Sequence, residues 1–173
     1  MKLKIFPFKK VKSTNSTAIR LINQNIKFGV VTSERQYKGR GRGTNRWISN
    51  YGNIFLSIFF PIKRNLSIKN ITKINLNVVK KVIKKHINEK INIKLPNDTL
   101  INQSKICGIL QEIIFKNNIK YIIIGIGINL NNSPIIPNYC TSYLNKYSKK
   151  NIKKLELIKE LKRNFEKKIE NFI

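Results

Sequence analysis

The chain has 173 residues, and its 35 Lys+Arg against 8 Asp+Glu give a formal net charge of +27. This length predicts a single domain, residues 1–173, and the 41% hydrophobic residues can supply its core. Eight carboxylates and one histidine, His86, are too few for a histidine-rich metal site or a cage of carboxylates. The two cysteines, Cys107 and Cys140, are too few for a disulfide framework and favour a reducing compartment.

The sequence shows no sign of a membrane span or a secretory signal. Its longest apolar stretch, residues 121–130, is about half as long as a membrane-spanning helix, so no membrane partner is expected. The first residues lead into Pro7 and further lysines rather than into the apolar core of a signal peptide. These features predict a cytoplasmic protein.

The strong positive charge raises the alternative of a nucleic-acid-binding module, because a basic chain attracts polyanions. The lysines, however, lie along almost the whole chain, and aromatic residues do not alternate with them as stacking platforms would. No specific nucleic-acid partner is therefore expected, and this alternative ranks last.

The first half of the chain shows one predicted helix and two predicted strands. Residues 13–17 are Ser, Thr and Asn, which cap helices, and the apolar residues after them predict a short helix to about Asn23. Residues 28–32 and 53–60 are apolar and β-prone, which predicts strands. Between them lies a polar segment, 34–50, rich in glycine and arginine.

The second half predicts a long helix, a short strand, a hairpin and a closing helix. Residues 68–89 carry apolar side chains at helical spacing, and 91–94 read as a strand. Residues 106–115 and 120–128 are β-branched runs joined by a short polar link, as in an antiparallel hairpin. Directly paired strands with helices to cover them predict an α+β fold. The closing helix has one apolar stripe, formed by Leu155, Ile158, Leu161, Phe165, Ile169 and Phe172.

The stretch Gly39-Arg40-Gly41-Arg42-Gly43 is the most informative in the chain. Its glycines disfavour regular structure, and its arginines can donate paired hydrogen bonds to phosphate or carboxylate. The combination is typical of a mobile loop that closes over an anionic ligand. A merely solvated loop is the alternative, but Trp47 and a strand follow directly, which favours an ordered ligand loop.

Three further segments combine turn or strand signals with polar groups. Residues 94–98 contain the only aspartate, Asp98, in what is otherwise an ordinary strand-ending turn. Lys105 stands at the start of a β run, where a lysine can reach a ligand or simply be solvated. Residues 125–129 alternate glycine with isoleucine, which permits close approach of a ligand or tight packing against a helix. No spacing of Ser or Cys with His and an acid indicates a nucleophilic catalytic set.

Taken in order, these segments resemble the biotin–protein ligase family. The resemblance spans most of the chain, and although each motif is modest, the ordered set is specific. The matching segments are Ser13-Thr14-Asn15, Gln36-Tyr37-Lys38-Gly39-Arg40-Gly41-Arg42 with Trp47, Lys94-Leu95-Pro96-Asn97-Asp98, Lys105-Ile106-Cys107-Gly108-Ile109-Leu110, Gly125-Ile126-Gly127-Ile128-Asn129 and Thr141-Ser142.

The resemblance implies a mixed, largely antiparallel sheet with helices packed on it, related to class II aminoacyl-tRNA synthetases. It also implies an ATP- and Mg²⁺-dependent reaction in two steps. The carboxylate of biotin attacks the α-phosphate of ATP to give biotinyl-5′-adenylate and pyrophosphate. A lysine of the biotin carboxyl carrier domain of acetyl-CoA carboxylase then attacks this anhydride and releases AMP.

The resemblance also implies a role for each matching residue. The catalytic residues are Arg42 and Lys105. Asp98 is expected near the metal, whose ligands the sequence does not identify. The biotin-binding residues are Ser13, Thr14, Asn15, Gln36, Arg40, Gly41, Arg42 and Lys105. The nucleotide-binding residues are Arg40, Lys94, Asn97, Asp98 and Asn129.

The sequence departs from the family pattern at several places. Thr44 and Asn45 stand where the family has a second Gly-Arg pair, Leu95 replaces a tryptophan, and Cys107 replaces a glycine or alanine. The sequence also lacks the N-terminal DNA-binding domain and the C-terminal small β-barrel of larger relatives, so we expect a monofunctional enzyme. A lipoate- or octanoate-protein ligase is the runner-up, and pairing of two copies into a homodimer is left open.

Overall fold

The computed structural model describes residues 2–63, 67–170 and 172. Within these residues the chain forms seven strands, three α-helices and a short 3-10 helix, Leu144–Lys146. The strands are β1 Ile5–Val11, β2 Gly29–Gln36, β3 Ile54–Pro61, β4 Ile91–Lys94, β5 Asp98–Ile101, β6 Ser104–Lys116 and β7 Ile119–Ile128. The α-helices are α1 Thr14–Asn23, α2 Ile68–Lys84 and α3 Lys154–Ile169.

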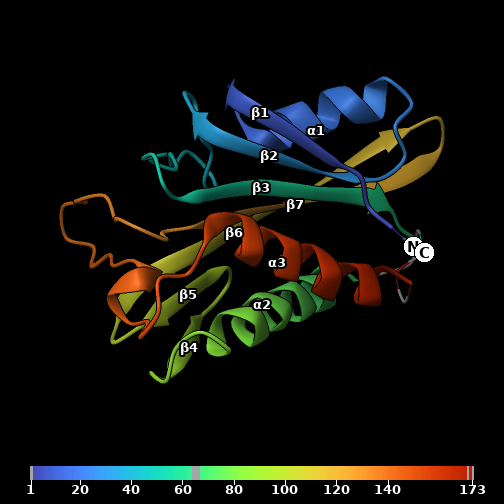
Figure 1. The fold of residues 1–173 in the computed structure, drawn as a ribbon. Helices are drawn as coiled ribbons and strands as arrows, with labels where there is room; N and C mark the ends of the chain where they lie inside the picture. Colours follow the sequence, from blue (N-terminus) through green and yellow to red (C-terminus); the bar gives the residue numbers. More distant parts are fainter. Residues whose placement is uncertain (1, 64–66, 171, 173) are drawn as a thin grey trace.

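All seven strands form one sheet in the order β1-β2-β3-β7-β6-β5-β4. The β1–β2 pair is parallel and every other neighbouring pair is antiparallel, which confirms the predicted mixed, largely antiparallel sheet. Helix α1 packs against one face of the sheet, whereas α2 and α3 lie together on the other (Figure 1). The fold therefore has three layers: α1, the sheet, and the pair of helices α2 and α3. The site described below lies on the face of the sheet that α1 covers.

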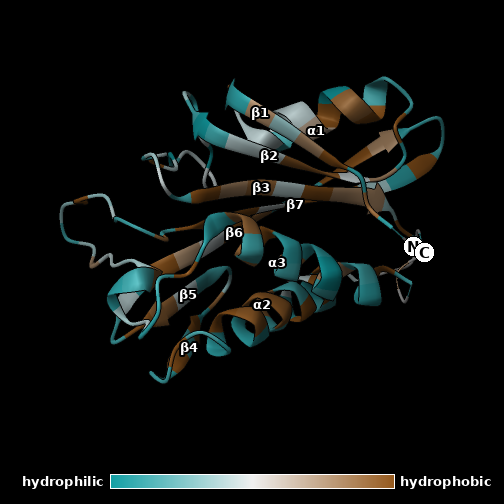
Figure 2. Cartoon of the chain, in the orientation of Figure 1, coloured by the Kyte–Doolittle hydropathy of each residue, from teal (hydrophilic) through white to brown (hydrophobic). Residues whose placement is uncertain are grey.

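Two apolar clusters hold the layers together. The larger one joins α2 and α3 to the sheet through residues such as Phe60, Val79 and Leu161, and the smaller one joins α1 to the opposite face through Ile22 and Phe59. Because both faces of β3 are covered, its residues 54–60 are buried without interruption. Most of this strand is hydrophobic (Figure 2). This burial removes apolar surface from water on both sides of the sheet and is the main source of stability.

The predicted β6–β7 hairpin is confirmed. Lys116 pairs with Ile119, and the two residues between them, Asn117 and Asn118, have φ angles of 47° and 61°. Two consecutive positive φ angles are what a tight hairpin turn needs, and asparagine tolerates them better than most residues. The hairpin carries β6 and β7 through the centre of the sheet, beneath the site.

The closing helix differs from its prediction at one end. Ile158, Leu161, Phe165 and Ile169 are buried as expected, but Leu155 is 70% exposed and Leu157 is buried instead. Leu157 lies four residues before Leu161, so it falls on the packed face of the helix, whereas Leu155 faces away from it.

Other boundaries also differ. Strand β1 was not predicted, because Pro7 and two lysines interrupt its apolar pattern, yet it pairs with β2 at the edge of the sheet. Helix α2 ends at Lys84 rather than Glu89. Residues 94–98 do form a turn, but it joins β4 to a further strand, β5. None of the described helices is long and apolar enough to cross a membrane.

Candidate active site

A cavity of about 250 Å³ opens on the α1 face of the sheet, between the first turn of α1 and the loop that follows β2. It brings together most of the residues predicted for the site, although they are far apart in the sequence. Its polar lining includes Ser13, Thr14, Asn15, Gln36, Arg40, Gly41, Arg42, Asn97, Asp98 and Lys105. Glycines of β6 and β7 (Gly108, Gly125 and Gly127) complete its wall.

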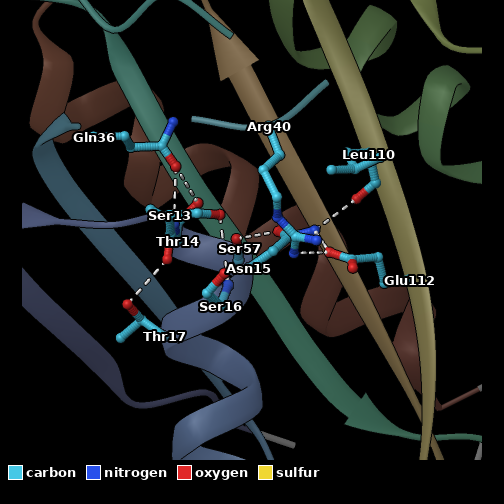
Figure 3. Close-up of polar contacts among 10 residues, drawn as sticks. All are labelled: Ser13, Thr14, Asn15, Ser16, Thr17, Gln36, Arg40, Ser57, Leu110 and Glu112. Carbon is cyan, nitrogen blue, oxygen red and sulfur yellow. Dashed lines mark hydrogen bonds and ion pairs between the residues drawn. The ribbon is translucent and has the colours of Figure 1, made fainter. Parts of the chain in front are cut away.

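The first turn of α1 is fixed to the end of β2. Ser13 caps the helix, since its side chain accepts a hydrogen bond from the Ser16 N–H. The backbone N–H and the hydroxyl of Thr14 both donate to Gln36 Oε1, at 2.8 Å and 3.1 Å (Figure 3). Gln36 in turn donates through Nε2 to the hydroxyl of Ser49 at 3.1 Å. These contacts orient the helix start toward the cavity and leave polar groups at its rim.

Asn15 is buried at the base of this turn and binds the sheet directly. Its Oδ1 accepts from the Ser57 hydroxyl at 2.5 Å, and its Nδ2 donates to the Leu110 carbonyl at 3.2 Å (Figure 3). The amide lies so close to β7 that a Cβ at Gly125 would overlap it. Gly125 therefore allows tight packing against a helix, which is one of the two alternatives for the alternating glycines, and Asn15 of α1 is its neighbour.

Residues 39–47, which we call the flap, form a closed loop over the cavity. The Trp47 N–H donates to the Gly39 carbonyl at 3.0 Å, and the Gly41 N–H donates to the Asn45 carbonyl at 2.8 Å. At the end of the flap the Trp47 ring packs so tightly on β7 that a Cβ at Gly127 would overlap it. The flap is thus an ordered loop, as the position of Trp47 and the following strand favoured.

Lys105 lies in a small cluster of charged and aromatic side chains. Its ammonium nitrogen is 2.8 Å from Asp98 Oδ1, and 5.4 Å and 5.6 Å from the ring centroids of Trp47 and Tyr139. The Tyr139 hydroxyl donates to Asp98 Oδ2 at 2.9 Å. Burial raises the pKa of Tyr139 to about 12, and the hydrogen bond with Asp98 and the negative charge of that residue add to the effect. At neutral pH this hydroxyl is therefore a neutral donor.

Two predicted residues lie outside this cavity. Lys94 is not among its lining residues, and its Nζ lies 5.3 Å from the ring centroid of Tyr139. Asn129 lines a second cavity of about 400 Å³, which shares Trp47, Asp98 and Lys105 with the first. The Asn129 side chain holds that wall together, donating to the Ser142 carbonyl at 3.1 Å.

The sequence interpretation missed Ser57, Glu112 and Tyr139. Ser57 and Glu112 both bind Asn15, and Glu112 also forms an ion pair with Arg40. Ser57 and Glu112 lie in strands and Tyr139 lies in a loop after a strand. The sequence pattern around each residue indicates only secondary structure, so nothing nearby in the sequence indicates a role in the site. His86 is paired with Glu160 on the opposite face, at 3.3 Å, and Cys107 is a buried core residue, as expected for both. Burial also raises the pKa of the Cys107 thiol, so the thiol stays protonated.

The acidic residues of the described chain offer little to a metal ion on their own. No group of three or more His, Cys, Asp or Glu side chains comes together in residues 2–63, 67–170 and 172. The acidic residue that lines the cavity is Asp98. A single carboxylate fits Mg²⁺ when that ion takes its remaining ligands from phosphates and water, as it usually does.

Comparison with known proteins places this chain in a family. A profile of the Biotin/lipoate A/B protein ligase family matches residues 7–129. The chain belongs to this family. It is 34% identical to the bifunctional ligase/repressor BirA of Bacillus subtilis over 131 residues, which cover 72% of this chain and 39% of that protein. The chain thus spans about two fifths of the length of this relative, and Tyr139 lies beyond the residues that the family profile matches.

Solved structures of biotin protein ligases share the fold of this family member. The ligase from Aquifex aeolicus in complex with biotin and ATP superposes with a TM-score of 0.81 at 24% identity, covering 96% of this chain and 70% of that one. The ligase from Leishmania major in complex with biotinyl-5-AMP gives a TM-score of 0.79 at 22% identity, covering 98% and 79%. At these identities the likeness establishes the fold alone.

Proposed function

We propose that the protein is an ATP-dependent ligase that activates biotin as biotinyl-5′-adenylate and transfers it to a lysine of a carrier protein. The acceptor in this proposal is the biotin carboxyl carrier domain of acetyl-CoA carboxylase, and the compartment is the cytoplasm, where ATP is available. The observation that carries the proposal is the cavity itself. It joins three arginines of the glycine-rich flap, the Lys105 ammonium and the polar first turn of α1 around one space.

The cavity offers groups that suit both the ring and the carboxylate of biotin. Ser13, Thr14 and Gln36 offer hydroxyl and amide groups to the polar ureido ring, and the ring of Trp47, packed on Gly127, adds an apolar surface. Arg40, Arg42 and Lys105 bring positive charge to the same cavity. A carboxylate and a phosphate repel each other, so cations that bind both are what their reaction requires.

Adenylation needs no covalent intermediate with the protein. A carboxylate oxygen of biotin forms a bond to the α-phosphorus of ATP, the bond from this phosphorus to the bridging oxygen breaks, and pyrophosphate leaves. Lys105 and Arg42 stabilise the charge that builds on the phosphate oxygens. In the second step the lysine amine of the carrier attacks the carbonyl carbon, loses its proton to solvent, and displaces AMP.

The flap protects the reactive anhydride between these steps. A mixed anhydride is hydrolysed by water, so a loop that closes over it preserves the product of adenylation. The flap can act in this way because its ends are fixed, by Gln36 bound to Ser49 and by Trp47 packed on β7, while the arginines between them are exposed. When Mg²⁺ is bound with ATP it neutralises phosphate charge, and Asp98 is the carboxylate that would hold it.

The direct test measures both steps with the purified chain. Melting temperature is recorded with biotin, with ATP and Mg²⁺, and with all three, because a trapped adenylate stabilises the folded state more than either ligand alone. The carrier domain is then added and its mass measured, with a variant that lacks the acceptor lysine as the control. A gain of one biotinyl group on the intact carrier only is the expected result.

The same assay separates biotin from the other acids that this family accepts. Lipoate and octanoate replace biotin in parallel reactions, each with a lipoyl domain as the acceptor. Mass gain with lipoate or octanoate and none with biotin would replace the proposal by its runner-up. No mass gain with any acid, at any ATP concentration and with folded protein, would refute ligase activity altogether.

A further inference from the structure

Glu112 is a carboxylate of β6 that binds two parts of the candidate site without lining the cavity. We propose that Glu112 is a positioning residue, which holds Arg40 of the flap against the first turn of α1 before any ligand binds. The expected effects on KM and kcat rest on the proposed function. The expected effect on the position of the flap does not. Figure 3 shows dashed lines that join the Glu112 carboxylate to the Arg40 guanidinium and to the Asn15 amide.

A single oxygen of Glu112 makes both contacts. Its Oε2 accepts from Arg40 Nη2 at 2.5 Å and from Asn15 Nδ2 at 2.7 Å. The guanidinium of Arg40 and the NH₂ group of Asn15 both donate to this oxygen, so the bridge requires an acceptor oxygen here, and a negatively charged one binds the guanidinium most strongly. The contact therefore joins residue 40 of the flap to residue 15 of α1 through residue 112 of the sheet.

The Asn15 side of this bridge is fixed by buried contacts. Because the Ser57 hydroxyl donates to Asn15 Oδ1, the NH₂ group of Asn15 must point toward Leu110 and Glu112. Asn15 is 2% exposed and Ser57 fully buried, so water cannot easily take the place of either partner. One partner of Glu112 is thus rigid, which makes the carboxylate a defined anchor for the other.

The Arg40 side of the bridge is the part that needs an anchor. Arg40 belongs to a glycine-rich loop, and among the described residues it is the flap arginine that has an ion pair; Arg42 and Arg46 are exposed. An arginine whose rotamer is already fixed loses less conformational freedom when an anion binds. Glu112 engages Nη2, and the guanidinium has further N–H groups with which to bind a carboxylate or phosphate.

The bridge is partly exposed to solvent, which limits its strength. The Arg40 and Glu112 side chains are 41% and 24% exposed, and ion pairs of this exposure are screened by solvent. Removing the carboxylate should therefore weaken binding of biotin without abolishing the reaction. We expect Glu112→Ala to raise KM for biotin about threefold, with kcat within about twofold of the unaltered protein.

The first experiment tests the bridge without any ligand. The chain has a single tryptophan, Trp47, which ends the flap, so tryptophan fluorescence reports how well this end of the flap is shielded from solvent. We expect acrylamide to quench Trp47 more strongly in Glu112→Ala, with Glu112→Gln intermediate because it keeps an acceptor oxygen but loses the charge. Glu34→Ala is the matched control, since it removes an exposed Glu–Lys ion pair from β2 that contacts α3 rather than the flap. Equal quenching in Glu112→Ala and Glu34→Ala would overturn the proposal.

The second experiment tests whether Glu112 acts through Arg40. KM and kcat are measured for Glu112→Ala, Arg40→Ala and the double variant. If Glu112 positions Arg40, its replacement has no further effect on KM once Arg40 is gone, and Glu112→Gln restores part of the single-variant loss. Additive effects, or a loss confined to kcat, would overturn the proposal. If the protein proves not to be a ligase, the quenching comparison still decides whether the bridge holds the flap.

Discussion

The Tyr139 hydroxyl and the Lys105 ammonium bind opposite oxygens of the Asp98 carboxylate, at 2.9 Å and 2.8 Å. The loop after β7 is in this way connected to the lysine at the start of β6. Because Asp98 accepts from both sides, its orientation is fixed, and with it the position of the Lys105 ammonium between the rings of Trp47 and Tyr139. Tyr139 therefore helps to hold Lys105 in place through Asp98, although no pattern in the sequence indicates this.

The first prediction removes only the hydroxyl of this tyrosine. Tyr139→Phe keeps the ring beside Lys105 but removes the hydroxyl that donates to Asp98. Loss of such a partly buried hydrogen bond costs about 1 kcal/mol. We expect the rate of adenylation, measured as pyrophosphate release at saturating biotin and ATP, to fall about threefold to tenfold. Tyr143→Phe, in the same loop but outside both cavity linings, is the control. An unchanged rate in Tyr139→Phe would show that the hydroxyl does not position Lys105.

The second prediction concerns Lys105 itself. Lys105→Ala removes the cation that we assign to the biotin carboxylate and the α-phosphate, and it leaves the Asp98 charge facing both anions. The loss of one such stabilising group costs about 10²-fold to 10³-fold in rate. Pyrophosphate release should fall by this factor while the melting temperature without ligands stays within a few degrees. Lys81→Ala, an exposed substitution on α2, gives the comparison for loss of a lysine elsewhere. Adenylation at the original rate would remove Lys105 from its assigned role.

The third prediction tests closure of the flap. Arg42→Gly should leave adenylation measurable but let biotinyl-adenylate escape, because the loop loses a cation that holds the phosphate. Bystander proteins with exposed lysines should then acquire biotin, about tenfold more than with the unaltered protein, while the carrier is still labelled. Mass spectrometry of an added bystander gives the measurement, and Lys38→Gly, just before the flap, controls for added flexibility. Bystander labelling equal in Arg42→Gly and Lys38→Gly would contradict this role.

Short motifs allowed the sequence to predict much of the cavity. Ser13, Gln36, Arg40 and Lys105 each occur in a segment that resembles the biotin–protein ligase family, and the cavity brings all four together. The predicted hairpin then explains why β6 and β7 face the flap, since their paired glycines occupy the same stretch of the sheet. The assigned roles of these residues remain predictions.

The residues that the sequence did not reveal act only through the fold. Glu112 is a single charged residue in an apolar strand, and such a residue is ordinarily solvated. Only the packing of α1 on the sheet that contains β6 brings Glu112 to Asn15. Tyr139 lies in a loop without periodicity, and its distance from Asp98 in sequence hides their contact. Strand β1 needed the pairing partner β2 to be stable, because its own sequence carries Pro7 and lysines. Long-range pairing of this kind has no local signature.

The last prediction concerns stability, at the point where the N-terminal segment meets α3. Glu166 Oε1 accepts from the Leu3 N–H and the Lys162 ammonium, each at 2.7 Å. Burial disfavours the charged carboxylate, but these hydrogen bonds and the nearby positive charge outweigh it and lower the pKa of Glu166 below its ordinary value of 4.5. A lowered pKa in the folded state means that the stabilisation is complete above pH 4.5 and disappears as the pH falls through the folded-state value.

Glu166→Gln should therefore reduce the free energy of unfolding by about 1 kcal/mol near pH 7, measured by urea denaturation. The difference between the two proteins should shrink as the pH is lowered below 4.5 and the carboxyl of the unaltered protein takes up its proton. Glu156→Gln is the control in the same helix, because its ion pair with Lys153 is long, at 3.9 Å, and exposed. A difference between Glu166→Gln and the unaltered protein that stayed constant with pH would mean that the loss comes from packing and not from the charge on Glu166.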